Sequence, residues 1–417
     1  MARARKPPAR VTIASNTCLT PEISIMSDAI LVLNSGSSSI KFGLFDISTA
    51  EPDLLCKGLL DEHDAQPRLT AMDTSGNRLF EKRRDAADND GKTLVIDILD
   101  WIDGYLAGGS LLAVGHRVVH GGRDFAGPVE VTDATIEALA ALTPLAPLHQ
   151  PRCLSPIRSI KSLRPGLRQI ACFDTAFHHG LAPPVSRFAI PRRFDEMGIR
   201  RYGFHGLSFE FIARRLADIS PALAAKRTVA AHLGNGASLC AMRDGKSVDT
   251  TMGLTPLDGL VMGTRCGAVD PGVLLYLQQE QRMSVDDIQH MLYQESGLLG
   301  VSGLSADMRA LLASDAPGPA EAIDLFTFRV AREVAAMANT LGGLECLVFT
   351  GGIGEHSKEI RQQICNRLRW LGVTMDPSAN DQARQCIGAK NSAVDILIIP
   401  TSEETTIARH CSAKLSE

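Results

Sequence analysis

The apolar and polar positions of the chain predict the same hairpin twice. In residues 29–46 the apolar runs Ile30 to Leu33 and Ile40 to Phe45 flank the polar segment Asn34-Ser-Gly-Ser-Ser-Ser39. This order is typical of a strand, a turn of small residues and a second strand. Residues 228–242 repeat the order around a turn of Gly, Asn and Ser. We therefore expect two similar strand–turn–strand units.

A third glycine-rich turn is expected later in the chain. The β-rich run Cys346 to Thr350 leads into Gly351-Gly-Ile-Gly-Glu355, which we interpret as a loop before a helix that starts near Ser357. None of the three turns has the Gly-x-Gly-x-x-Gly spacing of the Rossmann fingerprint, and the chain has no Walker motif. Both of those phosphate-binding folds are therefore excluded.

Other segments predict a mixture of helices and strands. Strands are expected within 51–90 and at 111–115, 169–173 and 394–399. Helices are expected at 93–106, 208–219, 272–282, 285–294, 305–313, 320–341, 358–371 and 377–387, and from Ser402 onward. Four prolines in 143–156 predict a rigid, extended and non-helical segment. The mixture indicates an α/β protein.

Polar residues follow two of the predicted strands. His116, Arg117, His120 and Arg123 come after 111–115, and Asp174 follows 169–173. Ligands of open α/β sheets bind at the carboxyl ends of the strands. We therefore expect an anion site beside the arginines, with a solvated loop as the alternative, and a metal or catalytic carboxylate at Asp174.

The turn after Asn34 has the chemistry of a phosphate site. It supplies an amide, several hydroxyls and a glycine, and Lys41 follows it, which together suit a phosphate and its metal ion. An ordinary solvated turn is the alternative, because serine-rich turns also hydrogen-bond to their own backbone. His149 and His205 can each be structural histidines, and Glu403 and Glu404 can serve only the dipole of the final helix.

Composition limits the class of protein. The 417 residues are enough for two domains, and the net charge of −4 gives no indication of a nucleic-acid or membrane partner. No run reaches the roughly 18 apolar residues that cross a bilayer, so a soluble protein is expected. Ten cysteines without Cys-x-x-Cys spacing favour the reducing cytoplasm. Residues 1–25 are Arg-rich and acid-poor, which fits a transit peptide, a disordered extension or a misplaced start codon.

Eight motifs in order resemble acetate kinases of the acetokinase family, within the superfamily of sugar kinases, Hsp70 and actin. They are Asn34–Lys41, Gly115–Gly122, Pro147–His149, Asp174–His178, Tyr202–Gly206, His232–Ser238, Met262–Arg265 and Gly351–Glu355. The resemblance implies a duplicated two-domain actin-like ATPase (ribonuclease H-like) fold with an interdomain cleft. It places domain I at 26–176 and domain II at 177–401, with the final helix 402–417 packing back on domain I.

The resemblance also implies a role for each matching residue. The catalytic residues would be Asp174, His205 and Arg265, and the acceptor would contact Arg117, Val119, Leu148, His149, Phe204 and Pro256. ATP or ADP would be held by Lys41, His232, Leu233, Gly234, Asn235, Gly236, Asp307, Met308, Arg309, Gly351, Gly352, Ile353, Gly354 and Glu355. Asn34 and Glu403 would organise Mg²⁺, or Mn²⁺ in its place.

The implied reaction is reversible transfer of the γ-phosphoryl group of ATP to acetate in a cytoplasmic homodimer. A carboxylate is already ionised at pH 7, so this reaction needs charge neutralisation rather than a strong base. Asp174 is therefore better interpreted as an organiser of a metal or an arginine. The alternatives are a propionate or other short-chain acyl kinase, a sugar kinase, and an Hsp70-like clamp driven by ATP.

The chain departs from the family pattern at several positions. Leu207 and Phe209 replace a usual threonine and histidine, and Cys266-Gly-Ala268 replaces a frequent Ser-Gly-Asp. Met308 and His356 replace a frequent phenylalanine and asparagine. None of these changes removes a residue assigned to phosphoryl transfer, but Met308 and His356 bear on nucleotide preference.

Overall fold

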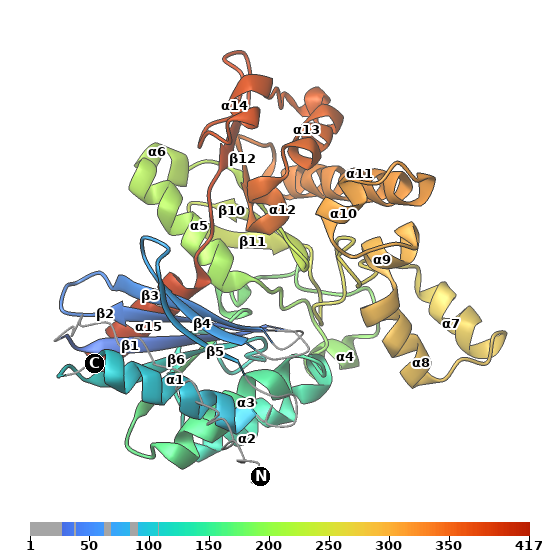
Figure 1. Cartoon of the computed structure of the whole chain (residues 1–417). Coiled ribbons are helices and arrows are strands. Elements are labelled where there is room, and N and C mark those ends of the chain that lie inside the picture. Colours follow the sequence, from blue (N-terminus) through green and yellow to red (C-terminus); the bar gives the residue numbers. More distant parts are fainter. Residues whose placement is uncertain (1–26, 37–38, 62–67, 84–90, 107) are drawn as a thin grey trace, which may run out of the picture.

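The computed structural model describes residues 27–36, 39–61, 68–83, 91–106 and 108–417, and it contains two β-sheets (Figure 1). The first sheet has eight strands in the order β5-β4-β3-β2-β1-β6-β8-β7, and the second has five in the order β11-β10-β9-β12-β13. The predicted extension 1–25 lies outside the described residues. The domain boundaries at 176 and 401 stay a prediction.

The first sheet is built around β1 (Ala29–Ser35), in which every residue is buried. β1 pairs antiparallel with β2 (Ser39–Asp46) and parallel with β6 (Leu111–Val118), so the predicted first hairpin is confirmed. The other strands are β3 (Asp53–Asp61), β4 (Arg68–Asp73), β5 (Arg78–Arg83), β7 (Val129–Glu130) and β8 (Arg168–Phe173).

The second sheet repeats this pairing. β9 (Thr228–Leu233) pairs antiparallel with β10 (Ala237–Arg243) and parallel with β12 (Cys346–Thr350). β11 (Lys246–Thr250) and β13 (Asp395–Ile398) complete the sheet. In both sheets, therefore, the first strand of a hairpin is the one that pairs with a later parallel strand, as a duplicated unit requires.

Helices cover both faces of each sheet. On the first sheet α1 (Gly91–Tyr105) and α3 (Gln150–Leu163) contribute to one apolar cluster, while α15 (Glu403–Leu415) packs with Ile30 and Val32 in another. On the second sheet α5 (Gly206–Ile219) and α11 (Pro317–Leu341) contribute to separate clusters. The last helix thus lies against the first sheet although it follows the second (Figure 1).

The remaining helices are short. They are α2 (Asp133–Ala141), α4 (Arg192–Glu196), α6 (Pro221–Ala224), α7 (Pro271–Gln279), α8 (Val285–His290), α9 (Gly297–Ser302), α10 (Met308–Leu312), α12 (Gly351–His356), α13 (Lys358–Arg367) and α14 (Pro377–Asp381). A π-helical turn, 291–295, follows α8, so the helix expected at 285–294 changes its winding partway. α10 and α14 are shorter than the predicted helices at 305–313 and 377–387.

The prediction of an extended segment at 143–156 was wrong. Thr143–Leu145 forms a 3-10 turn, and α3 begins at Gln150. Pro151 lies in the first turn of α3, where its missing N–H removes no helical hydrogen bond. Pro156 does remove one, and the burial of Ile157 and Ile160 on the same helix offsets that loss.

Two other element boundaries also differ from expectation. Gly351–Glu355 is not a loop but most of the short helix α12, which starts directly after β12. Gly351 makes this junction possible, because its φ is +75° and a Cβ there would lie 2.8 Å from the carbonyl oxygen of Leu233. β6 continues to Val118, so His116 and Arg117 lie within the strand rather than after it.

Candidate active site

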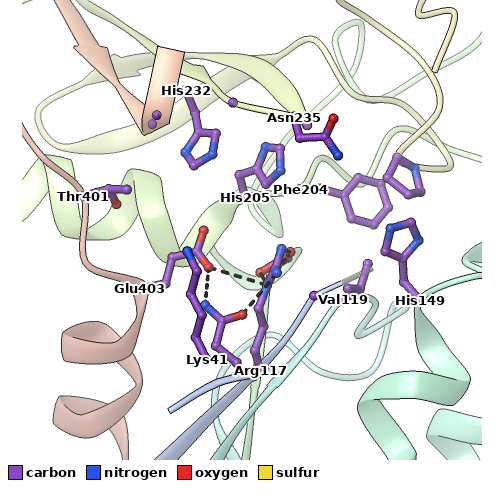
Figure 2. A pocket seen from close by; sticks show the side chains of 18 of the residues that line it. Lys41, Arg117, Val119, His149, Phe204, His205, His232, Asn235, Thr401 and Glu403 are labelled. Atoms are coloured by element: carbon purple, nitrogen blue, oxygen red, sulfur yellow. Dashed lines mark hydrogen bonds and ion pairs between the residues drawn. The ribbon is translucent and has the colours of Figure 1, made fainter. Parts of the chain in front are cut away.

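A cavity of about 550 Å³ is lined by residues from strands of both sheets and from loops and helix starts (Figure 2). Its lining consists of Asn34, Gly36, Lys41, Arg117, Val119, His149, Asp174, Phe204, His205, His232, Gly234, Asn235, Gly236, Pro256, Arg265, Gly351, Gly352, Glu355, His356, Thr401, Glu403 and Glu404. The structure therefore brings together most of the residues that the motifs predicted.

A hydrogen-bonded network of charged and polar groups forms one side of the cavity. Arg117 donates through Nε to Asp174 Oδ1 at 3.0 Å and through Nη2 to Asp174 Oδ2 at 2.6 Å. Its Nη1 donates to the amide oxygen of Asn34 at 3.2 Å. The amide nitrogen of Asn34 donates in turn to Glu403 at 2.9 Å and to Glu404 at 2.8 Å. The network thereby joins the strand β6 to the end of β1 and to the start of α15.

Burial and charge act in opposite directions in this network. Burial raises the pKa of the Asp174 carboxyl above its usual value, although the guanidinium of Arg117 counteracts it. Burial also opposes ionisation of Glu403, but Arg117 and His232 outweigh it and hold the pKa of that carboxyl below its usual value. Arg117 stays charged, because Asp174 and Glu403 compensate for its own desolvation and raise its pKa.

Arg265 is the second guanidinium of the cavity, and it differs from Arg117 in its partners. Its Nη1 donates to the backbone carbonyl of Pro256 at 2.5 Å. Within the described part of the chain no carboxylate forms an ion pair with it. Burial, together with the nearby charge of Arg117, lowers the pKa of Arg265 to about 10. A cation that is desolvated and lacks a counter-ion is prepared to bind an anion.

Two histidines stack against each other across the cavity from Arg117 and Lys41 (Figure 2). The ring centroids of His205 and His232 are 4.3 Å apart with an interplanar angle of 19°. Burial and neighbouring cations lower the pKa of His205 well below its usual value, and burial lowers that of His232. Both rings are therefore neutral near pH 7. His205 also adopts a left-handed backbone, with φ 56° and ψ 24°, at the start of α5.

An apolar wall lies at one end of the cavity. Val119, Phe204 and Pro256 line it, whereas Leu148 is 36% exposed and lies outside the lining, although it was predicted to contact the acceptor. His149 also lines the cavity, and its Nδ1 has no hydrogen-bond partner among the described residues. Burial and the charges of Arg265 and Arg117 lower the pKa of His149 to about 3, so this ring is neutral as well.

The residues predicted to hold the nucleotide divide into two groups. Lys41, His232, Gly234, Asn235, Gly236, Gly351, Gly352 and Glu355 line the cavity. Leu233, Ile353 and Gly354 lie in the same segments but outside the lining. Asp307, Met308 and Arg309 are at the start of α10, where Asp307 caps the helix and pairs with Arg309, and Met308 is buried. The structure does not bring this last group to the cavity.

Four residues of the lining were not predicted as site residues: Gly36, His356, Thr401 and Glu404. Glu404 is the most informative, because it receives a hydrogen bond from Asn34 as Glu403 does. Its signal in the sequence was its place beside Glu403 in the first turn of the last helix. Stabilisation of the helix dipole explains both glutamates equally well, so the sequence alone gave no reason to assign Glu404 to the site.

The residues around Asn34 fit a hydrated magnesium ion. No group of three or more His, Cys, Asp or Glu side chains in the described part of the chain could by itself hold a metal. Mg²⁺, however, is usually bound by one or two carboxylates together with substrate phosphates and water. Glu403 and Glu404, both held by Asn34, supply such a pair of carboxylates at the edge of the cavity.

The sequence itself decides the family. Residues 29–409 match the profile of the acetokinase family. The chain belongs to this family. It is 51% identical to the acetate kinase of Rhodopseudomonas palustris strain TIE-1 over 391 residues, which are 92% of this chain and 98% of that one.

Two solved structures confirm the predicted fold of this acetokinase family member. The acetate kinase of Porphyromonas gingivalis superposes with a TM-score of 0.82 at 34% identity, covering 94% of this chain and 100% of that one. A propionate kinase from Francisella tularensis superposes with a TM-score of 0.85 at 38% identity, covering 92% and 98%. The duplicated α/β architecture of the actin-like ATPases is thereby confirmed.

Among the described helices none is both long and apolar enough to cross a membrane.

Proposed function

We propose that the protein is an acetate kinase that transfers the γ-phosphoryl group of ATP to acetate, reversibly and with Mg²⁺, giving acetyl phosphate and ADP. The observation that carries this proposal is the position of Arg117 and Arg265 in one cavity with the apolar wall of Val119, Phe204 and Pro256. The acceptor carboxylate would bind the guanidinium groups, and its methyl group would face the wall.

The network around Arg117 supports a reaction that needs no general base. Acetate is ionised at pH 7 and can attack phosphorus directly. The barrier lies instead in bringing two anions together, which calls for cations and hydrogen-bond donors aimed at the transferring group. Arg117, Arg265 and the rings of His205 and His232 supply them, while both oxygens of Asp174 are occupied by Arg117. Asp174 would therefore orient Arg117 and would not remove a proton.

ATP would bind with its phosphates along the glycine-rich segments of the second sheet. Gly234, Gly236, Gly351 and Gly352 line the cavity without side chains, so backbone N–H groups can approach phosphate oxygens. Lys41 reaches the cavity from the first sheet and would contact the phosphates. Asn34, Glu403 and Glu404 would hold Mg²⁺ or Mn²⁺, which neutralises part of the phosphate charge when it is bound.

We also propose a cytoplasmic homodimer. The nine described cysteines are all free, which fits a reducing compartment. α7 has no buried residue, and Val273, Leu275 and Tyr276 on it are 44%, 55% and 56% exposed. A second copy of this chain would cover these side chains, since exposed apolar side chains gathered on one helix are what such an interface buries. Sedimentation at several concentrations tests this assignment.

The function is tested by trapping the product. The purified protein is incubated with ATP, Mg²⁺ and acetate, propionate or butyrate, and the acyl phosphate is captured as the hydroxamate while ADP is measured separately. We expect equal amounts of ADP and hydroxamate, with acetate giving the highest kcat/KM. A higher kcat/KM for propionate would make the protein a propionate kinase, as one solved relative is named. ADP formation without any hydroxamate would support the ATP-driven clamp instead.

A further inference from the structure

The stacked histidines of the cavity are each hydrogen-bonded to a buried serine through the nitrogen that faces away from the cavity. His205 Nδ1 lies 2.8 Å from Ser238 Oγ, and His232 Nδ1 lies 2.9 Å from Ser208 Oγ. Ser238 and Ser208 are both fully buried. Neither serine lines the cavity, so neither can contact a substrate directly.

The hydrogen bond of Ser238 fixes the tautomer of His205. In the part of the chain that the structure describes, the Ser238 hydroxyl has His205 Nδ1 as its single partner. If Nδ1 carried the proton, the hydroxyl would accept it and its own O–H would be buried without an acceptor. Such a donor costs about 1–3 kcal/mol. The arrangement that satisfies every group has Ser238 donating to Nδ1, which leaves the ring proton on Nε2.

The Nε2 atom of His205 lies beside Gly236, close to the guanidinium of Arg265. A Cβ on Gly236 would lie 3.2 Å from His205 Nε2 and 2.6 Å from Nη2 of Arg265, so all three groups meet at one point of the cavity. Gly236 leaves this space open. A proton on Nε2 would therefore be directed at an anionic oxygen held by Arg265.

His232 is held by a longer chain of the same kind. Ser208 Oγ lies between His232 Nδ1 and Thr401 Oγ1, at 2.9 Å and 2.8 Å. This chain is satisfied in either direction; when Thr401 donates to Ser208 and Ser208 donates to Nδ1, as Ser238 does to His205, the second ring also carries its proton on Nε2. This chain links His232 to the segment just before Glu403 and Glu404.

We propose that Ser238 and Ser208 are positioning residues that hold His205 and His232 in the Nε2–H tautomer, so that each ring presents an uncharged donor to the transferring phosphoryl group. This inference rests on the proposed function. The serines themselves do not contact the substrate. The ability of each ring to donate from Nε2 depends on the hydroxyl group of its serine. Each ring can donate without first acquiring a proton from solution.

The first test is the effect of Ser238→Ala on the steady-state constants. The variant leaves Nδ1 of His205 without a donor, so we expect kcat to fall by about ten-fold to 10²-fold, as for a weakened transition-state donor, with KM for acetate and ATP within about two-fold. Ser238→Thr keeps the hydroxyl and should recover most of the rate. An unchanged kcat in Ser238→Ala, or no recovery in Ser238→Thr despite a normal fold, would overturn the proposal.

Ser247→Ala is the matched control, because this chain contains the same bond outside the cavity. Ser247 Oγ lies 2.7 Å from Nδ1 of His178, a buried histidine whose Nε2 faces the carbonyl oxygen of Phe204. The control removes a serine–histidine bond of nearly the same length, 2.7 Å against 2.8 Å, and should leave kcat within about two-fold of wild type. A loss in Ser247→Ala as large as that in Ser238→Ala would show that general destabilisation explains both.

A neutron crystal structure of the wild-type protein tests the tautomer without any variant. We expect deuterium on Nε2 of His205 and of His232 and on the Ser238 hydroxyl, directed at Nδ1. Deuterium on Nδ1 of His205 would refute the proposal even if the protein makes acetyl phosphate. Conversely, deuterium on Nε2 in a protein that forms no acyl phosphate would support the tautomer and contradict the proposed function.

Discussion

Arg117 and Asp174 form a buried two-point ion pair, with Nε and Nη2 of the guanidinium 3.0 Å and 2.6 Å from the two carboxylate oxygens. The Asp174 side chain is 1% exposed. Both of its oxygens are occupied, and the remaining Nη1 of Arg117 points to Asn34. The pair therefore fixes where the charge of Arg117 lies in the cavity.

The ion pair predicts that Asp174 acts only through Arg117. Asp174→Asn should lower kcat by about 10²-fold, because the neutral amide no longer holds the guanidinium at two points. The double variant Arg117→Ala/Asp174→Asn should then be no slower than Arg117→Ala alone, because Asp174 has no guanidinium to hold once Arg117 is replaced. Initial rates of the three variants and wild type measure this coupling. Additive losses would mean that Asp174 has its own role in the reaction.

Arg265 should be required for catalysis but not for folding. Arg265→Ala removes a cation that has no carboxylate partner in the described structure, so we expect kcat to fall by roughly 10²-fold or more with little change in the midpoint of thermal unfolding. Arg243→Ala is the matched control, since Arg243 also donates to a backbone carbonyl, that of Leu341 at 2.7 Å, but lies outside the cavity. Near-normal turnover by Arg265→Ala would place the anion site elsewhere.

Val119 should limit the length of the acceptor. It is 3% exposed and lines the cavity beside Phe204. Each methylene in such a pocket changes discrimination by about 1–3 kcal/mol, so Val119→Ala should raise kcat/KM for propionate relative to acetate by roughly ten-fold. Val118→Ala removes the same volume from the buried neighbour of Val119, at the end of β6, and should leave the ratio unchanged. An unaltered ratio in Val119→Ala would remove Val119 from the acceptor pocket.

Local patterns were enough to predict the elements that the site depends on. β1 and β9 are apolar runs ended by small polar residues, and each forms the expected hairpin. The helix expected from Ser402 is α15, which Ser402 caps, and the helix expected at 285 begins with a capping box of Ser284 and Asp287. Such signals depend on neighbouring residues only, so they can be read without knowledge of the fold.

The failures came from contacts between distant segments. Pro151 and Pro156 argued against α3, but the helix is stabilised by apolar residues that pack against the first sheet. Glu404 was not predicted as a site residue because its partner, Asn34, is 370 residues away in sequence. Asp307 to Arg309 were predicted to hold ATP from the resemblance, and their nucleotide role stays a prediction. The sequence shows which chemical groups each residue has, whereas the fold determines which distant residues those groups contact.

Three buried histidines should make the protein acid-sensitive. Burial lowers the pKa of His116, His120 and His178 from 6.5 to about 4 in the folded protein. Between these pH values the unfolded chain binds more protons, so the free energy of unfolding falls as the pH is lowered through this window. The contribution of each histidine is at most about 1.4 kcal/mol per pH unit.

Denaturation in urea at pH 7 and pH 5 measures this effect. In His116→Asn the stability lost between the two pH values should be smaller than in wild type, because one of the buried histidines with a lowered pKa is no longer present. The same loss in His116→Asn as in wild type would contradict the assignment of His116 as a buried neutral ring.

The last prediction is that the two halves close around the substrates. Asn34 and Arg117 reach the cavity from the first sheet, and His232, Gly234 and Gly351 reach it from the second, so the reacting groups must meet between the sheets. An open cavity would also admit water, which could accept the phosphoryl group in place of acetate. Hinge closure is a common way to exclude it.

The chain passes between the sheets at Asp174–His179 and again at Pro400–Glu403, and we expect the hinge there. Solution scattering should show a smaller radius of gyration when ADP, Mg²⁺, acetate and a planar phosphoryl mimic are added together, at a constant oligomeric state. ADP and Mg²⁺ alone should give a smaller change, because acetate and the mimic complete the contacts between Arg117 and the second sheet. Equal dimensions in all conditions would show that the cavity is already in its reactive form and that residues near 175 and 401 do not bend.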